Sequence, residues 1–155
     1  MQTPTTNRSL TQSAHAHRET TVCVVDPRAA DYETWHGEAA GAGLMLHFCS
    51  TAEEALRFGR THAVALWVVN TELSGLSGHE LCGMLKNLSA ATLVYLVADQ
   101  YSPAAERAAW SARATLFGCK PAHTAWLSEF LQFQSRPTST RRIESHGNRS
   151  LVRCG

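Results

Sequence analysis

The chain has 155 residues, which is enough for one domain of ordinary size with tails and excludes a large multidomain enzyme. Hydrophobic residues make up 44%, as in globular proteins, and no apolar run approaches the roughly 18 residues that a membrane helix needs. The formal net charge is +1, but residues 21–133 hold 11 acidic and 7 basic side chains, so the basic excess lies at the two ends. No apolar segment occurs near the first residue, so we expect no signal peptide and a cytoplasmic protein.

The two ends of the chain differ in composition from its middle. Residues 1–20 are rich in Thr, Ser, Gln and His, and residues 135–155 are similar with additional arginines. Neither segment holds enough apolar side chains to offset the entropy of ordering it, so we expect disordered tails around one domain at 21–134. The arginines of the second tail are spaced apart without interleaved aromatics, which disfavours nucleic-acid binding.

Five short apolar runs lie along the central region. They occupy residues 22–25, 44–49, 63–69, 93–98 and 114–119. Runs that are continuously apolar, rather than alternating with polar residues, are typical of strands buried on both faces in a parallel sheet. His47 interrupts the second run, so we expect that strand at an edge of the sheet.

Helix signals fill the intervals between these runs. The signals are Tyr32, Trp35, Ala39 and Ala42 at helical spacing, capping-box patterns at 51–54 and 77–80, Ser102 followed by Pro103, and Pro121 before Trp126, Leu127, Phe130 and Leu131. Five alternating strand and helix segments predict a doubly wound α/β sandwich, with helices on both faces of the sheet.

Cysteine usage points to buried thiols in a reducing compartment. The five cysteines form no CxxC pair, and three of them lie within the apolar runs, where a thiol behaves as a small hydrophobe. An odd number of unpaired cysteines would be a liability in a secreted protein.

Candidate functional residues lie at the ends of the expected strands, where doubly wound folds gather their functional groups. Asp26 follows the first run, Asn70 the third and Lys120 the fifth, and Val97 lies near the end of the fourth.

Four segments of the sequence resemble the receiver domains of two-component response regulators. They are residues 22–26, 49–56, 70–81 and 117–121, and the stretch 73–81 with the Lys120-Pro121 pair makes the match specific. The resemblance spans residues 21–133. It implies a flavodoxin-like (βα)5 fold with a five-stranded parallel sheet in the order 2-1-3-4-5, a cis Lys120–Pro121 bond, and a phosphorylatable aspartate that binds Mg²⁺.

The sequence departs from the family's pattern where the chemistry takes place. The phospho-accepting aspartate falls on Asn70, whose amide is not a nucleophile, and the second of two adjacent acids falls on Pro27. The switching Ser or Thr falls on Val97, which has no hydroxyl. Two lost carboxylates should leave Mg²⁺ binding weak or absent, so we expect no cofactor or metal. Asp26 and Lys120 remain and should form a structural salt bridge.

Glu72 lies two residues past Asn70 at the rim of this expected pocket. With Asp26 it could supply two carboxylates to an unusual cation. A solvated loop glutamate is favoured, since no further ligand is apparent.

A surplus of large apolar residues marks the expected fourth helix, fifth strand and fifth helix. Trp110, Trp126 and Phe133 accompany Phe117, which falls at the family's switching aromatic. These large apolar side chains are more than one buried helix stripe requires. Either they form an interface with a partner or a second copy of the chain, which we expect to contain Trp126, or they fold onto the core.

These observations lead to two expected functions. The first is a stand-alone, non-enzymatic pseudo-receiver of phosphorelay signal transduction, which contacts signalling proteins such as a histidine kinase or a downstream effector independently of phosphorylation. The alternative is a sensor that binds an anion or small ligand in the vacated pocket, where Lys120 would lack its three carboxylates. No common catalytic motif, such as GxSxG, HExxH or a P-loop, is present, which disfavours an enzyme.

Overall fold

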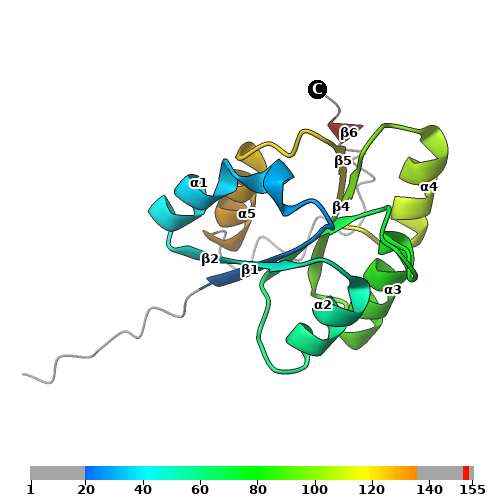
Figure 1. The fold of residues 1–155 in the computed structure, drawn as a ribbon, viewed down its shortest axis with the longest axis horizontal. Coiled ribbons are helices and arrows are strands. Elements are labelled where there is room, and N and C mark those ends of the chain that lie inside the picture. Colours follow the sequence, from blue (N-terminus) through cyan, green and yellow to red (C-terminus); the bar gives the residue numbers. More distant parts are fainter. Residues whose placement is uncertain (1–19, 136–151, 154–155) are drawn as a thin grey trace, which may run out of the picture.

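A parallel β-sheet lies at the centre of the computed structural model, which describes residues 20–135 and 152–153 (Figure 1). The strands follow the order β2-β1-β3-β4-β5-β6. Their bounds are β1 (Thr20–Val25), β2 (Leu44–Cys49), β3 (Leu66–Asn70), β4 (Leu93–Ala98), β5 (Leu116–Cys119) and β6 (Val152–Arg153). The expected order 2-1-3-4-5 is confirmed, and every neighbouring pair of strands is parallel.

The sixth strand is an addition that the sequence pattern does not predict. Its two residues pair with β5, with Val152 opposite Phe117 and Arg153 opposite Gly118. A disordered tail was expected over 135–155, whereas the structure places this part of it in the sheet. Residues 1–19, 136–151 and 154–155 lie outside the described residues.

Helices cover both faces of the sheet, as the alternation of segments predicts (Figure 1). The helices are the 3-10 turn η1 (Ala29–Tyr32), α1 (Trp35–Gly41), α2 (Ala52–Gly59), α3 (Gly78–Leu88), α4 (Pro103–Ser111) and α5 (Ala125–Ser135). The first helix differs from expectation, because Tyr32 ends the 3-10 turn and Trp35 begins a separate α-helix.

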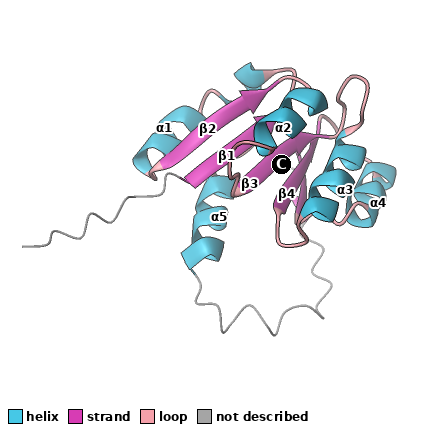
Figure 2. Cartoon of the chain, turned by 90° about the horizontal axis from the view of Figure 1, so that it is seen from below, coloured by secondary structure: helices cyan, strands magenta, loops and turns pink. Residues whose placement is uncertain are grey.

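Two apolar layers explain why the strands are continuously apolar. Val22 and Val24 of β1 belong to the layer under α1 and α5, whereas Cys23 and Val25 belong to the layer under α2, α3 and α4. Successive side chains of a strand point to opposite faces, so a strand covered on both sides buries all of them. β2 is an edge strand, as expected, because β1 is the only one of the described strands that lies beside it (Figure 2).

The helix starts agree with their sequence signals. Ser77 accepts a hydrogen bond from the Glu80 backbone N–H while the Glu80 carboxylate accepts one from the Ser77 N–H, which is a complete capping box. Thr51 caps α2, and Ser102 caps α4 with Pro103 in the first turn. None of the helices in the described part of the chain has the length and apolar character needed to span a bilayer.

Candidate functional site

The carboxyl ends of the central strands bring together the candidate site residues. Asp26 directly follows β1, Asn70 ends β3, Asp99 directly follows β4 and Lys120 directly follows β5. Because the strands are parallel and paired in register, these ends lie at one edge of the sheet. The structure therefore gathers side chains that are far apart in the sequence.

Lys120 is surrounded by carboxylates. Its Nζ lies 2.7 Å from Asp26 Oδ2, 2.6 Å from Asp31 Oδ2 and 3.2 Å from Asp99 Oδ1, and only 10% of its side chain is exposed. The expected pair with Asp26 is present. The expectation that Lys120 lacks three carboxylates is wrong, because Asp31 and Asp99 approach it from the loops after β1 and β4.

Asn70 links two of these carboxylates through its amide. Its Nδ2 donates to Asp26 Oδ2 at 3.0 Å and to Asp99 Oδ1 at 3.2 Å, and its Oδ1 accepts from the Glu72 backbone N–H at 2.8 Å. The residue is 1% exposed. An aspartate in this position would have no N–H to donate and would place a third negative group against two others.

Asp26 receives hydrogen bonds on both carboxylate oxygens. Oδ1 accepts from the Arg28 backbone N–H at 2.9 Å, and Oδ2 accepts from the Tyr32 hydroxyl at 3.1 Å. Burial, followed by the charge of Asp26, raises the pKa of Tyr32 above its usual value, so the hydroxyl keeps its proton and remains a donor. The lysine ammonium also lies 5.9 Å from the centre of the Tyr32 ring.

Asp99 forms ion pairs with Arg28 and Lys120. Burial opposes ionisation of Asp99, but the hydrogen bonds from Arg28, Lys120 and Asn70 outweigh it and hold its pKa below the usual value. Burial likewise opposes the charge of Lys120, but its contacts with Asp26 and Asp31 outweigh that effect and raise the pKa of Lys120. Both groups are therefore charged at neutral pH.

The cluster carries its own counter-charges. The carboxylates of Asp26, Asp31 and Asp99 face the cations of Arg28 and Lys120, so the formal charge is about −1 with every group ionised. Among residues 20–135 and 152–153, no group of three His, Cys, Asp or Glu side chains is arranged to hold a metal ion.

Two other predicted site residues contribute little to this network. Val97 is fully buried and its side chain belongs to the apolar layer under α1 and α5. Glu72 is exposed at the rim and contacts Asn70 through its backbone N–H.

The expected place of Trp126 in an interface is wrong, and both Trp126 and Phe117 follow the other alternative, in which the aromatics fold onto the core. Trp126 is 1% exposed and its ring meets Trp35 edge to face at 6.2 Å, and Phe117 is fully buried in the opposite layer. The apolar stripe of α5 points Trp126 into one core layer, and β5 points Phe117 into the opposite layer, so both rings belong to the core. Trp110 is half-buried against the core, and Phe133 is 40% exposed.

Sequence reasoning missed Arg28, Asp31, Tyr32 and Asp99. Asp99 lies one residue beyond the fourth apolar run, so reading that strand end one position further would have found it. Arg28, Asp31 and Tyr32 reach the site because the 3-10 turn η1 folds back over the end of β1, and no periodic pattern in the sequence signals that turn.

No protein-family model matches the chain, and no curated protein matches it in sequence. Solved structures do resemble it. A CheY-like response regulator receiver domain protein from Methanospirillum hungatei has a TM-score of 0.67 and 19% identity, with 75% of this chain and 93% of that chain covered. The signal receiver domain of an HD domain-containing protein from Pseudomonas fluorescens has a TM-score of 0.67 and 18% identity, with 75% and 94% covered.

A third similar structure is the chemotaxis response regulator CheY4 of Vibrio cholerae, with a TM-score of 0.64 and 17% identity, covering 74% of this chain and 98% of that one. The Lys120–Pro121 bond is cis, as the resemblance in the sequence implies. Together with the strand order, these similarities show that the chain has the flavodoxin-like receiver fold of response regulators.

Proposed function

We propose that this chain is a pseudo-receiver: a non-catalytic module of two-component signalling that works through protein–protein contacts and does not require phosphorylation. The observation that carries the proposal is the position of Asn70. It ends β3, is buried, and donates its amide hydrogens to Asp26 and Asp99. An amide nitrogen engaged in this way is not a nucleophile that can accept a phosphoryl group.

The donor set does not fit the Mg²⁺ that receiver chemistry requires. Mg²⁺ needs near-octahedral oxygen coordination with several carboxylates or waters. Here the Lys120 ammonium lies among the carboxylate oxygens of Asp26, Asp31 and Asp99, and Asn70 turns its NH₂ group toward two of them. A cation would have to displace the lysine and face the amide hydrogens, so we expect Mg²⁺ to bind weakly or not at all.

The same geometry argues against an anion sensor. A sensor of this kind would need Lys120 to be free to bind the anion, but three carboxylates already neutralise it. With the cluster at a formal charge of about −1, an incoming phosphate or carboxylate would be repelled. The ion-pair cluster supports a structural role instead, in which it holds the strand ends in one arrangement.

The partner surface that we propose lies over α4 and α5, because β6 covers the edge of β5 that lies between them. Phe133 of α5 remains exposed there, and Trp110 of α4 is half-buried, whereas Trp126 and Phe117 are excluded by their burial. The expected partners are signalling proteins in the cytoplasm or a second copy of the chain. A receiver works by a two-state equilibrium of its surface, and without a phosphate the binding partner must select the state.

The decisive experiment compares intact mass and amide NMR spectra before and after addition of Mg²⁺ with acetyl phosphate, and then with beryllofluoride. We expect no mass increase and no shifts at the amides of Asn70, Asp99 and Lys120. A phosphate adduct, or saturable Mg²⁺-dependent shifts at these strand ends, would refute the proposal.

The variant Asn70→Asp tests the role of the amide directly. It places a carboxylate beside Asp26 and Asp99, so we expect the free energy of unfolding at pH 7 without Mg²⁺ to fall by about 2 kcal/mol. Asn87→Asp, an exposed position on α3, controls for the added charge and should change little. Urea unfolding monitored by circular dichroism gives both values, and equal effects would show that the Asn70 amide contributes nothing special.

A further inference from the structure

A pair of thiols joins the edge strand of the sheet to its neighbour. Cys23 of β1 and Cys49 of β2 are both buried, and their sulfur atoms lie 3.8 Å apart. In the register of the two strands, Cys23 lies opposite His47 and Cys49 lies opposite Val25, so the thiols are diagonal neighbours. Both side chains belong to the layer under α2, α3 and α4. They therefore point toward each other on one face of the sheet.

The two thiols are not equivalent. The hydrogen bond from the Cys23 thiol lowers the pKa of Cys49, although burial and the charge of Glu54 act in the opposite direction. The pKa of Cys23 is raised, because its proton is held between the two sulfurs and because it is buried. Of the two sulfurs, Cys49 is therefore the one that loses its proton more easily, and the thiolate is the nucleophilic form.

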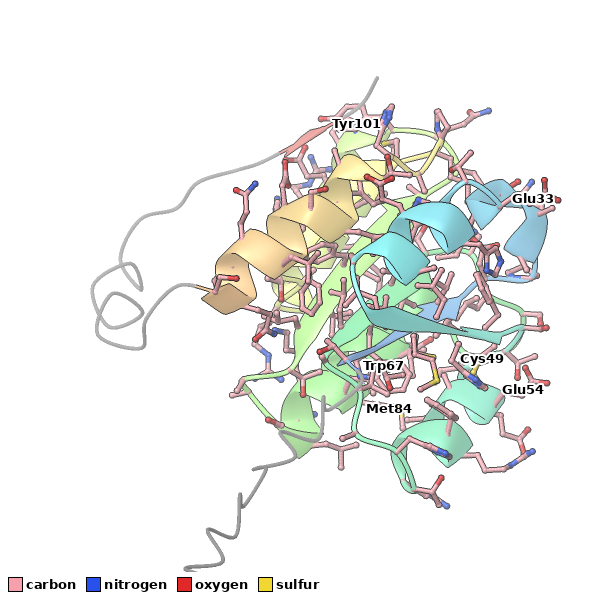
Figure 3. The ribbon with its side chains drawn as sticks, turned by 90° about the vertical axis from the view of Figure 1, so that its left-hand side faces the viewer. Glu33, Cys49, Glu54, Trp67, Met84 and Tyr101 are labelled. Carbon is pink, nitrogen blue, oxygen red and sulfur yellow. The ribbon has the colours of Figure 1, made fainter. Side chains whose placement is uncertain are left out.

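Cys49 is also the thiol nearer to solvent. It lines a shallow, open cleft of 480 Å³ between β2 and α2. Besides Cys49, its lining includes Phe48 of β2 and Glu54 and Phe58 of α2. Figure 3 shows Cys49 and Glu54 close together on this side of the molecule. Cys49 is 3% exposed and borders this cleft, whereas Cys23 is fully buried behind it in β1, so an oxidant that enters from this side meets Cys49 first.

Disulfide formation requires the sulfurs to approach from 3.8 Å to about 2.0 Å. β2 can make this movement more easily than any central strand, because β1 is its only neighbouring strand within residues 20–135 and 152–153.

We propose that Cys49 is a site of oxidation by peroxides and that Cys23 resolves it to a Cys23–Cys49 disulfide. The Cys49 sulfur attacks one peroxide oxygen, the O–O bond breaks, and a sulfenic acid forms while the second oxygen leaves as water or an alcohol after protonation. The Cys23 sulfur then attacks the Cys49 sulfur, the S–O bond breaks, and the hydroxyl leaves as water with the Cys23 proton. Two thiols are oxidised and one peroxide is reduced.

The disulfide would alter the end of β1 where the carboxylate cluster begins. The Asp26 backbone N–H donates to the Cys49 carbonyl oxygen at 3.0 Å, so a movement of β2 at Cys49 reaches Asp26 directly. The oxidation site is independent of the proposed function, since it depends on the two thiols and the cleft and not on Asn70.

The test treats the full-length protein with one equivalent of hydrogen peroxide, alkylates the remaining thiols, and maps tryptic peptides by mass spectrometry. Cleavage after Arg18, Arg28 and Arg57 places Cys23 in residues 19–28 and Cys49 in residues 29–57, each as the only cysteine of its peptide. We expect these two peptides linked with the loss of two hydrogens. Cys49→Ala should abolish the link, and Cys23→Ala should leave a sulfenic acid on Cys49 that dimedone traps.

Cys82 is the matched control. It is fully buried and burial raises its pKa to about 11, so we expect Cys49 to react with a small alkylating reagent about tenfold faster. Cys82→Ala should not affect the link. A disulfide between any other cysteines, over-oxidation of Cys49 with Cys23 intact, or equal reactivity of Cys49 and Cys82 in the folded wild-type protein would overturn the proposal.

Discussion

At the scale of single residues, Asp99 shows how charge holds the strand ends of this receiver fold together. Its carboxylate contacts Arg28 after β1, Asn70 at the end of β3 and Lys120 after β5. Each of these contacts favours the ionised carboxylate over the neutral acid. The site is therefore held together by charge, and its strength must depend on pH.

The variant Asp99→Asn should be less stable than the wild type by about 1 kcal/mol at pH 7, a modest value because 27% of the Asp99 side chain is exposed and solvent screens its ion pairs. The pKa of Asp99 is lower in the folded protein than in the unfolded chain. The stability that ionised Asp99 provides is therefore fully present above its unfolded pKa of about 4, and it is lost as the pH falls through the lower folded-state pKa. The difference between the two proteins should therefore decrease as the pH falls below about 4.

Urea unfolding between pH 2.5 and pH 7 measures this difference. Glu53→Gln is the control, because Glu53 forms an exposed ion pair with Arg57 on α2 and should have little effect across the range. A difference between Asp99→Asn and the wild type that persists unchanged at pH 2.5 would show that the ion pairs do not stabilise the fold.

At the scale of elements, the contact between the start of α3 and the end of β3 positions Asn70. The Gly78 backbone N–H donates to the Thr71 carbonyl at 3.1 Å. A Cβ at Gly78 would lie 2.0 Å from the Asn70 carbonyl oxygen and 2.9 Å from the Thr71 Cα. Only glycine allows the helix to approach the strand this closely.

Gly78→Ala should therefore lower the free energy of unfolding by about 2–3 kcal/mol, because the backbone on either side must shift. Gly83→Ala, in the same helix, is the matched control. A Cβ at Gly83 meets no atom within 4 Å, so alanine should stabilise the protein by about 0.5–1 kcal/mol through its higher helix propensity. Thermal and urea unfolding give both values, and a Gly78→Ala variant as stable as the wild type would contradict the close contact.

At the scale of the whole molecule, the apolar layer between the sheet and the helices α1 and α5 packs together residues that are distant in the sequence. Trp35 of α1 packs edge to face against Trp126 of α5, and its Nε1 donates to the Ala122 carbonyl at 3.1 Å. Both tryptophans are almost fully buried. This layer, and not the molecular surface, is where Trp126 contributes.

Trp126→Ala should lower the free energy of unfolding by about 3–5 kcal/mol without changing the oligomeric state of the folded protein. Phe133→Ala, on the exposed side of the same helix, should cost less than about 1 kcal/mol. Chemical unfolding and sedimentation velocity measure the two properties. A small decrease in the free energy of unfolding of Trp126→Ala, together with a changed oligomeric state, would show that Trp126 lies in an interface.

The sequence by itself determined the first five strands of this fold, the starts of helices α2, α3 and α4, and three residues of its site. Continuous apolar runs mark strands buried on both faces, capping signals mark the helix starts, and the ends of those strands carry Asp26, Asn70 and Lys120. These features are readable because each depends on residues close together in the chain, within one period of a strand or helix.

Only the tertiary structure decided which side chains come into contact at the site and in the core. Asp31 reaches Lys120 across 89 positions of the sequence because the turn η1 folds over the end of β1, and Asp99 arrives from another loop. The burial of Trp126 and the approach of Cys23 to Cys49 depend in the same way on how layers and strands pack. Such contacts depend on loop geometry and on packing between segments that are distant in the sequence. Local patterns of hydrophobicity predict neither of these.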